Sequence, residues 1–307
     1  MKTPAALLAV LGAWAAACGG KLELDDAGTI DATPAVDAHV DATPPLDASA
    51  PDVAAVETGG PFTPASLANL VLWLDASHLV KTDTSGRVLG WGDQSSFKND
   101  AAASISGAPT LLQTGIHGLA SIHFDPSATA PLYMLIADSP SLRWGAGDFL
   151  VAVLARYTNN PANGYTTGAA SFFFKSTFSG SSGSGVSLWG NVPLSNGSVA
   201  DGLLMLEDAK TYAVDKTGYH DGVARLFVAR RQAQTMDLRV NGATTATQAE
   251  PSSVDVSATG TPVIIGALAQ TYYRIFGDVS EIVALKGATV PSDLAALESY
   301  FETKYGL

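Results

Sequence analysis

The sequence predicts an all-β fold, an antiparallel β-sandwich that ends in one short α-helix. Ten short segments are rich in apolar, β-branched and aromatic residues, and most are bounded by Gly, Pro, Asn, Asp or Ser. No helical pattern lies between these segments, which excludes a parallel sheet of alternating strands and helices. The 30 glycines supply the frequent turns that a fold of many short strands requires.

Residues 1–18 have the layout of an export signal. Met1 and Lys2 give a positive start, and the apolar run from Ala5 to Ala17 is too short to span a bilayer as a stable helix. The small residues directly before Cys18 resemble the end of a bacterial lipoprotein signal, in which that cysteine is lipidated. An ordinary signal peptide cleaved near Ala17 is the alternative.

Cys18 is the only cysteine of the chain. An exported protein with a single thiol forms no internal disulfide, and lipidation gives this residue a use. The resemblance implies that the chain reaches its membrane through a lipid anchor, and Gly19, where Asp would signal inner-membrane retention, favours the outer membrane. We therefore expect an exported outer membrane lipoprotein at the cell surface or in the periplasm.

Residues 19–61 are predicted to form a disordered linker. They hold nine acidic residues against one lysine, and Asp-Ala pairs alternate with prolines. Such a segment cannot bury enough apolar surface to offset the entropy lost on ordering. Closely spaced aspartates also occur in calcium loops, but the Gly turn and the bidentate Glu of an EF-hand loop are missing. The better interpretation is a stalk that holds residues 62–307 away from the membrane.

Residues 62–307 are predicted to form one domain, because β-sandwiches of this size commonly form a single unit. Residues 236–242 alternate apolar and polar side chains and end in Asn241-Gly242, the strongest short signal for a type I′ hairpin. The ten predicted strand segments are residues 70–74, 121–124, 149–155, 171–175, 186–189, 203–206, 223–230, 236–240, 262–265 and 279–285.

The C-terminal segment carries the helical pattern of the domain. Pro291-Ser292-Asp293 provides an N-cap and an acidic first turn, and Gly306 can end the helix. An apolar stripe recurs at helical spacing, and it should pack on the sandwich. Its members are Leu294, Leu297, Phe301 and Tyr305.

A set of short motifs, in order, resembles the concanavalin A-like lectin and glucanase fold in its laminin-G-like form. The motifs are residues 70–76 (LVLWLDA), 88–95 (VLGWGDQS), 99–101, 120–125 (ASIHFD), 237–242 (DLRVNG), 264–266, 277–282 and the closing helix. Together they span nearly all of residues 62–307. The resemblance implies a jelly-roll sandwich, and proteins of this kind include sugar binders, adhesins and accessory modules of glycan hydrolases.

The residues that carry chemistry favour a protein that is not an enzyme. Retaining glycanases of this fold class carry the pattern Glu-x-Asp-x-x-Glu, which no glutamate of this chain begins. Asp278 and Glu281 should point to opposite faces of one strand, which disfavours an acid/base pair. The Ser/Gly run at residues 179–185 lacks the Gly-x-Ser-x-Gly pattern of a nucleophile elbow, and the five histidines form no zinc motif.

Candidate binding residues follow from the resemblance and from positions near turns. Laminin-G-like relatives often hold calcium near the ligand face, and the resemblance makes Asp125, directly after a strand, a candidate calcium ligand. A turn-capping role for Asp125 is the alternative. Sugar binding uses aromatic rings beside fixed polar groups, although rings near turns can equally pack in the core. The aromatic candidates are Trp144, Tyr165, Trp189, Tyr272 and Tyr273.

These observations predict a non-catalytic, lipid-anchored binding module that recognises extracellular carbohydrate or protein, with calcium as its one candidate cofactor. Nucleic acid is excluded as a partner, because the net charge is −12 and no basic cluster is longer than Arg230-Arg231. Two alternatives stay open: a divergent glycan hydrolase or lyase of the same fold, and a structural protein of the cell envelope.

Overall fold

The computed structural model describes residues 61–104, 107–125, 132–158, 170–177, 183–193, 199–206, 211–250, 254–267 and 274–307. The signal segment, Cys18 and nearly all of the linker lie outside these ranges, so their assignments stay predictions. Within the described ranges, no helix is long and apolar enough to cross a membrane.

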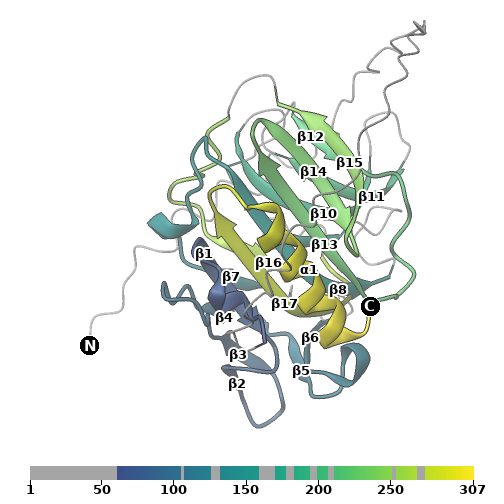
Figure 1. Cartoon of the computed structure of the whole chain (residues 1–307). Helices are drawn as coiled ribbons and strands as arrows, with labels where there is room; N and C mark the ends of the chain where they lie inside the picture. Colours follow the sequence, from purple (N-terminus) through teal and green to yellow (C-terminus); the bar gives the residue numbers. More distant parts are fainter. Residues whose placement is uncertain are drawn as a thin grey trace, which may run out of the picture.

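The described residues form two antiparallel sheets and one α-helix, which confirms the predicted fold class (Figure 1). The eight-stranded sheet has the order β15 (Ala243–Ala249), β14 (Thr235–Val240), β13 (Arg225–Gln232), β8 (Phe149–Tyr157), β17 (Gly277–Lys286), β6 (Ser121–Phe124) and β5 (Thr110–Leu112), and β1 (Leu70–Asp75) also pairs with β17. The nine-stranded sheet has the order β12 (Tyr212–Val214), β11 (Val199–Leu206), β10 (Gly185–Pro193), β9 (Ala170–Ser176), β16 (Val263–Ile265), β7 (Met134–Ile136), β4 (Ala101–Ala103), β3 (Val88–Trp91) and β2 (Val80–Thr82).

Strands that the sequence patterns missed are mostly too short to show a period. β2, β4, β5, β7 and β12 have three residues each. β15 is longer, but its sequence ATTATQA has no large apolar residue and its side chains are mostly exposed. The predicted hairpin is present, since β14 pairs with β15 across Asn241-Gly242. Short 3-10 turns cover Pro64–Ser66, Ile116–Gly118 and Pro140–Leu142.

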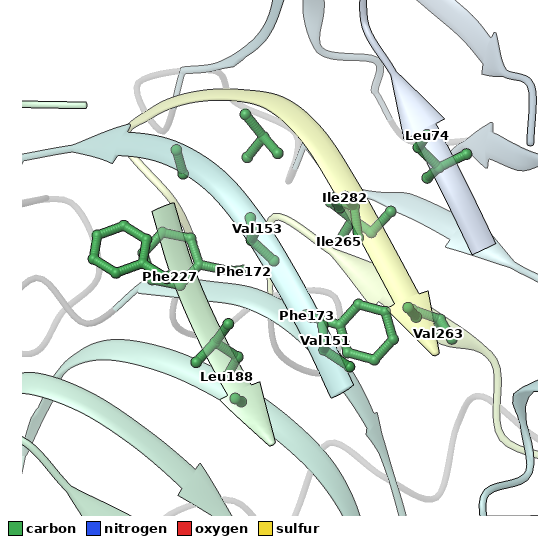
Figure 2. Close-up of a cluster of buried hydrophobic side chains, with 14 of the residues drawn as sticks. Leu74, Val151, Val153, Phe172, Phe173, Leu188, Phe227, Val263, Ile265 and Ile282 are labelled. Carbon is green, nitrogen blue, oxygen red and sulfur yellow. The ribbon is translucent and has the colours of Figure 1, made fainter. Parts of the chain in front are cut away.

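The main core fills the space between the two sheets. Figure 2 shows Val151 and Val153 of β8 in this layer, near rings from the facing sheet. The rings of Phe172 and Phe227 stack across it with centroids 5.3 Å apart. Each sheet turns one set of alternating side chains inward, as the period of two along a strand requires.

A second core lies on the outer face of the eight-stranded sheet, the face that points away from the other sheet. Leu150 and Leu154 of β8 point to this side and pack beneath helix α1 (Pro291–Tyr305), which Figure 1 shows in front of β17 and β8. Both faces of β8 are therefore buried, and this explains why its sequence is a continuous apolar run.

Helix α1 begins two residues earlier than an N-cap at Ser292 would imply. The N-cap is Val290, which makes no side-chain hydrogen bond, and Pro291 starts the first turn. Gly306 ends the helix in the left-handed conformation at φ 63°, as its position in the sequence predicts. The predicted apolar stripe packs on the outer face of the eight-stranded sheet.

Several strands end at the same side of the sandwich, which we call the connection end. In strand register, Gly277 at the start of β17 lies opposite Phe124 at the end of β6 and Tyr157 at the end of β8. In the other sheet, Ala170 at the start of β9 lies opposite Gly190 near the end of β10. The connections at these strand ends join β6 to β7, β8 to β9, β10 to β11, β12 to β13 and β16 to β17.

Buried charged side chains tie down the connections at the opposite end. Lys175 of β9 donates from Nζ to the carbonyl oxygen of Thr261 at 2.7 Å and to Asp138 Oδ1 at 2.8 Å. Arg231 of β13 donates from Nη1 to the carbonyl oxygen of Val254 at 2.8 Å. These bonds satisfy buried cations, so this end of the sandwich is held from inside by specific contacts.

Candidate functional site

Two neighbouring loops lie beside the end of β1, and we call them the loop pair. Residues 76–79 follow β1, and residues 92–100 follow β3. Asp93 forms a bridge with Leu74, and the amide of Gly92 donates to the carbonyl oxygen of Leu79 at 3.0 Å. The two loops therefore adjoin and form one continuous part of the surface.

The buried carboxylate of Asp93 organises the second loop. It accepts hydrogen bonds from the amides of Trp73, Ser95 and Asn99, each at 2.8 Å, and from the hydroxyl of Ser95 at 2.6 Å. The bond to Ser95 is the local turn that Asp forms with the second residue after it. Because Trp73 belongs to β1, the same carboxylate also fastens the loop to the eight-stranded sheet.

Asn99 fixes the far end of this loop. Its side-chain nitrogen donates to the carbonyl oxygen of Val71 at 2.8 Å and to Ser141 Oγ at 2.9 Å. Its side-chain oxygen accepts from the hydroxyl of Ser139 at 2.7 Å. The loop is thus held at both ends by buried polar contacts, and residues 96–98 between them are exposed.

Asp75 organises the first loop in the same way. One of its oxygens accepts from the amide of Ser77 at 2.8 Å, and the other lies 2.8 Å from His78 Nδ1 and accepts from Lys304 Nζ at 2.7 Å. Burial acts to raise the pKa of Asp75, but the bond to Lys304 and its charge, with the bonds from Ser77 and His78, bring that pKa below its usual value. Asp75 is therefore a paired carboxylate that orients His78.

A second buried carboxylate, Glu281 of β17, shares the same lysine. It accepts from Lys304 Nζ at 2.6 Å and from the ring nitrogen of Trp73 at 2.6 Å, and the hydroxyls of Tyr300 and Tyr305 donate to it at 3.0 and 2.9 Å. Burial raises the pKa of Glu281, and burial beside Glu281 raises the pKa of both tyrosines. The network joins helix α1 to the sheet and to the loop pair.

This network contains a carboxylate pair, but its geometry does not suit glycoside hydrolysis. Asp75 and Glu281 are both buried, and their oxygens are taken by donors of the fold. An acid and a nucleophile must reach the sugar that they cleave, and room must remain between them for the bond that breaks. The arrangement is that of a structural ion-pair network.

The expectation that Asp278 and Glu281 lie on opposite faces of their strand is wrong. The pairing of β17 with β8 shifts between Val279 and Glu281, so a β-bulge adds one residue at Ser280. Val279 and Ile282 point into the main core, and both acidic residues therefore point to the outer face. The two carboxylates nevertheless belong to different polar networks. Asp278 pairs with His123 and Arg156, and Glu281 pairs with Lys304.

The loop pair presents the aromatic ring of Phe97, which is not among the ligand contacts predicted from the sequence. Phe97 is 53% exposed, and Leu79 on the adjoining loop is 59% exposed. Every other aromatic side chain whose burial the structure describes is buried or half-buried. A sequence signal does exist, because Phe97 lies in the polar turn segment Ser95–Asn99, but its exposure depends on the tertiary partners of Asp93 and Asn99.

Two residues of the loop pair also have a strained backbone conformation. Leu79 has φ 55° and Lys98 has φ 56°, in the left-handed region that bulky residues rarely adopt. Such conformations cost about 1 kcal/mol or more, and they cluster at functional sites. The side chains of Leu79 and Lys98 gain little packing in return, since both residues are exposed.

The predicted ligand contact Trp144 is a core residue, which corrects its expected place near the loop rim. Its ring nitrogen donates to the carbonyl oxygen of Leu285 at 3.1 Å, and its ring packs against Phe149 and Phe173. The segment after the turn Pro140–Leu142 passes inward between the sheets, which buries the indole. No face of this ring is open to a ligand.

The second predicted tryptophan, Trp189, is also buried, but in a different place. It lies on β10 and stacks on Phe174 of β9, with ring centroids 6.3 Å apart and planes 23° apart. With Tyr133 and Ile264 it forms a small apolar cluster separate from the main core. The ring is covered in this structure, so of the two roles that the sequence leaves open for Trp189, packing is the one observed.

The candidate calcium ligand Asp125 and the three candidate tyrosines remain predictions. Asp125 follows β6 and is half-buried, and within the described ranges no group of three or more His, Cys, Asp or Glu side chains gathers to hold a metal ion. The calcium role of Asp125 stays a prediction. Tyr165, Tyr272 and Tyr273 lie outside the described residues, as does Cys18.

The fold defines a class, a β-sandwich domain, and comparison with known proteins agrees with that class. No family model and no curated protein sequence matches the chain. The binding domain of Paraclostridial Mosquitocidal Protein 1 is similar with a TM-score of 0.52 and 11% identity, over 78% of this chain and 53% of that one. The binding domain of Botulinum Neurotoxin serotype G is similar with a TM-score of 0.50 and 9% identity, over 76% and 52%. This chain thus spans about half of each structure, and the likeness shows the fold.

Proposed function

We propose that this chain is a non-catalytic binding module, exported and anchored through a lipid at Cys18, that recognises extracellular carbohydrate or protein. The observation that carries the proposal is the loop pair, which holds Phe97 and Leu79 exposed on a rigid base. The acidic stalk of residues 19–61 would hold this surface away from the membrane.

An exposed ring on a fixed loop is suited to recognition. Because Phe97 is 53% exposed, the fold forgoes part of the burial energy of an aromatic side chain, which for full burial is on the order of 1.5–3 kcal/mol. The same energy becomes available when a partner covers the ring. Because Asp93 and Asn99 already order the loop, a partner does not have to order it on binding, which favours affinity.

Polar groups on the loop pair fit a sugar. The CH face of a sugar packs on an aromatic ring, and its hydroxyls need fixed hydrogen-bond partners. His78 is oriented by Asp75 through Nδ1, and Lys98 lies next to Phe97 with Nζ 3.4 Å from the carbonyl oxygen of Asp93. The loop pair thus carries an exposed aromatic ring, a lysine next to it in sequence and an oriented imidazole on the adjoining loop, which supports carbohydrate as the first ligand class to test.

The two similar solved structures are consistent with this proposal. Both carry the words "binding domain" in their names, and both share the sandwich fold with this chain. Their names state no ligand, so the choice of carbohydrate is carried by the loop pair. Calcium as an assisting ion belongs to the proposal through the resemblance that points to Asp125.

A glycan array probed with the full chain, with and without calcium, tests the proposal. We expect binding to a limited set of glycans, and a loss of about tenfold in affinity for Phe97→Ala, because a stacked ring and its buried area are removed. Circular dichroism and thermal unfolding should show that the variant folds.

The matched control is Val290→Ala. Val290 is an apolar residue that is 51% exposed and lies far from the loop pair in the sequence. This variant should bind as the unsubstituted chain does. Absence of any glycan binding under both calcium conditions would count against carbohydrate, and equal affinity of the Phe97 variant would remove the loop pair as the binding surface.

A further inference from the structure

Three neighbouring strands place His123, Asp278 and Arg156 side by side, and we call these residues the polar row. Asp278 of β17 lies directly opposite His123 of β6 and Arg156 of β8 in strand register. Their strand neighbours, including Ile122 and Val279, belong to the core between the sheets. The polar row therefore points to the outer face of the eight-stranded sheet.

The carboxylate of Asp278 holds the other two side chains in place. Its Oδ1 lies 2.7 Å from His123 Nδ1, and its Oδ2 accepts from Arg156 Nε at 2.6 Å. Asp278 is buried, whereas the side chains of His123 and Arg156 are 32% and 37% exposed. The negative charge thus lies beneath, and an imidazole and a guanidinium face the solvent.

The polar row keeps hydrogen-bonding capacity that its contacts within the fold do not use. Among the described residues, the polar side-chain contacts of His123 and Arg156 are those with Asp278. Arg156 uses Nε for this contact, so its two terminal nitrogens remain available as donors. His123 uses Nδ1, and its Nε2 is therefore directed away from the carboxylate.

The polar row lies at the connection end of the sandwich. Arg156 is the last residue but one of β8, and Asp278 is the second residue of β17. Binding residues are found disproportionately where connections meet a rigid scaffold, and the polar row stands on three paired strands at such a place.

We propose that the polar row binds the oxyanion of an acidic sugar, either a carboxylate or a sulfate ester. A planar guanidinium donates to two oxygens of such a group in a fixed geometry, and the imidazole supplies a further polar contact beside it. This inference rests on the proposed carbohydrate function and adds the charge class of the ligand. It also gives the chain, which has a net charge of −12, a local place for an anion.

Substituting Asp125 distinguishes direct anion binding by the polar row from ligand binding through a calcium ion at Asp125. Asp125 directly follows β6, two residues after His123, and its charge acts on the His123 imidazole. A negative charge there opposes the approach of an anion, so Asp125→Asn should strengthen the binding of an acidic sugar. If Asp125 instead holds calcium that the ligand needs, the same substitution should weaken binding and remove its dependence on calcium.

The first experiment measures the affinity of the full chain for three oligosaccharides of one backbone: neutral, carboxylated and sulfated. We expect at least one acidic form to bind about tenfold more tightly than the neutral form, because each charge-assisted hydrogen bond adds more than a neutral one. The two acidic arms distinguish the carboxylate from the sulfate. Arg156→Gln should remove the preference.

The control for this substitution is Arg87→Gln, since Arg87 is also exposed and also donates from Nε to an aspartate, Asp83, at 2.7 Å. It should keep the preference for the acidic form. Equal affinity for neutral and acidic forms, or a preference that survives Arg156→Gln, would overturn the inference while leaving carbohydrate binding at the loop pair intact.

A second measurement decides the inference even if no oligosaccharide binds. The imidazole signals of His123 in the full chain are followed by NMR while glucuronate, inorganic sulfate or glucose is added. A saturable shift with either anion, absent with glucose and absent in Arg156→Gln, supports an oxyanion site. No shift with either anion overturns it. If the His123 signals shift with an anion but the glycan array shows no binding, the anion site is supported and the carbohydrate function is rejected.

Discussion

At the scale of single residues, buried carboxylates determine which side chains face the solvent and how. Asp75, Asp93 and Asp278 are all buried, and each binds donors from a different segment of the chain. A buried carboxylate must be paired, so it fixes the position of every group that pairs with it. Phe97 and Arg156 owe their positions to such pairing.

Residue type alone could not separate buried aromatic rings from exposed ones. From their sequence positions Trp144 and Trp189 could either contact a ligand or pack inside, and both are buried, because one follows a turn that passes inward and the other lies within β10. Phe97 is exposed because Asn99 bonds to Val71 and to Ser141, which is distant in the sequence. Contacts between residues that are distant in the sequence produce no local sequence pattern, so they could not be predicted.

A buried tyrosine predicts how stability changes in alkali. The hydroxyl of Tyr219 donates to Asp215 at 2.5 Å, and burial together with that bond raises the pKa of Tyr219 to about 12. Because the folded pKa lies above the usual value of 10.0, the contribution of this hydroxyl to stability is complete below pH 10 and is lost as the pH rises to about 12.

Substituting Tyr219→Phe should therefore destabilise the protein by about 1–2 kcal/mol at neutral pH, since the buried Asp215 loses a donor. The difference in unfolding free energy between the two proteins should shrink between pH 10 and 12. Urea unfolding at several pH values measures it, and a difference that stays constant up to pH 12 would contradict the assigned bond.

At the scale of secondary structure, periodicity predicted the long elements and failed at irregular ones. The C-terminal helix and the hairpin at Asn241-Gly242 follow from patterns that need no tertiary information. The β-bulge in β17 does not, since one extra residue reverses the face on which Glu281 lies without leaving a mark in the sequence. The polar row likewise depends on strand register, which unites residues 123, 156 and 278.

Helix α1 is attached by the ion-pair network as well as by its apolar stripe. Lys304 lies between the buried carboxylates of Asp75 and Glu281. Lys304→Met removes the cation and leaves those carboxylates without their partner, which should cost about 3 kcal/mol of unfolding free energy. Chemical denaturation followed by tryptophan fluorescence measures this change.

The control is Lys286→Met, at an exposed lysine that donates to the carbonyl oxygen of Pro140, and it should change stability little. Adding Glu281→Gln to Lys304→Met should recover part of the loss, because a buried charge disappears while an acceptor for Trp73 and the tyrosines remains. A loss no larger than that of the control would show that the apolar stripe alone holds the helix.

At the scale of the whole molecule, the sandwich was predictable because many weak signals agree. Short apolar segments, frequent turn residues and the absence of helical patterns between them allow few other architectures. The distribution of polar contacts over its two ends was not predictable, since Lys175 and Arg231 reach partners that are distant in the sequence. One end is held by buried cations, and the other carries the polar row.

The anchor predicted at Cys18 concerns the placement of this whole molecule. A lipid-modified N-terminus holds a protein in the membrane through buried acyl chains, whereas residues 19–61 have no apolar segment that could do so. We expect the full chain, expressed in a bacterium that processes lipoproteins, to sediment with membranes and to enter detergent extracts. Cys18→Ser should prevent lipidation and reduce the detergent-extracted fraction, with mass spectrometry of the N-terminal peptide identifying the acyl groups. If processing occurs near Ala17 without lipid, mass spectrometry finds an unmodified N-terminus, and both proteins partition alike into the soluble fraction.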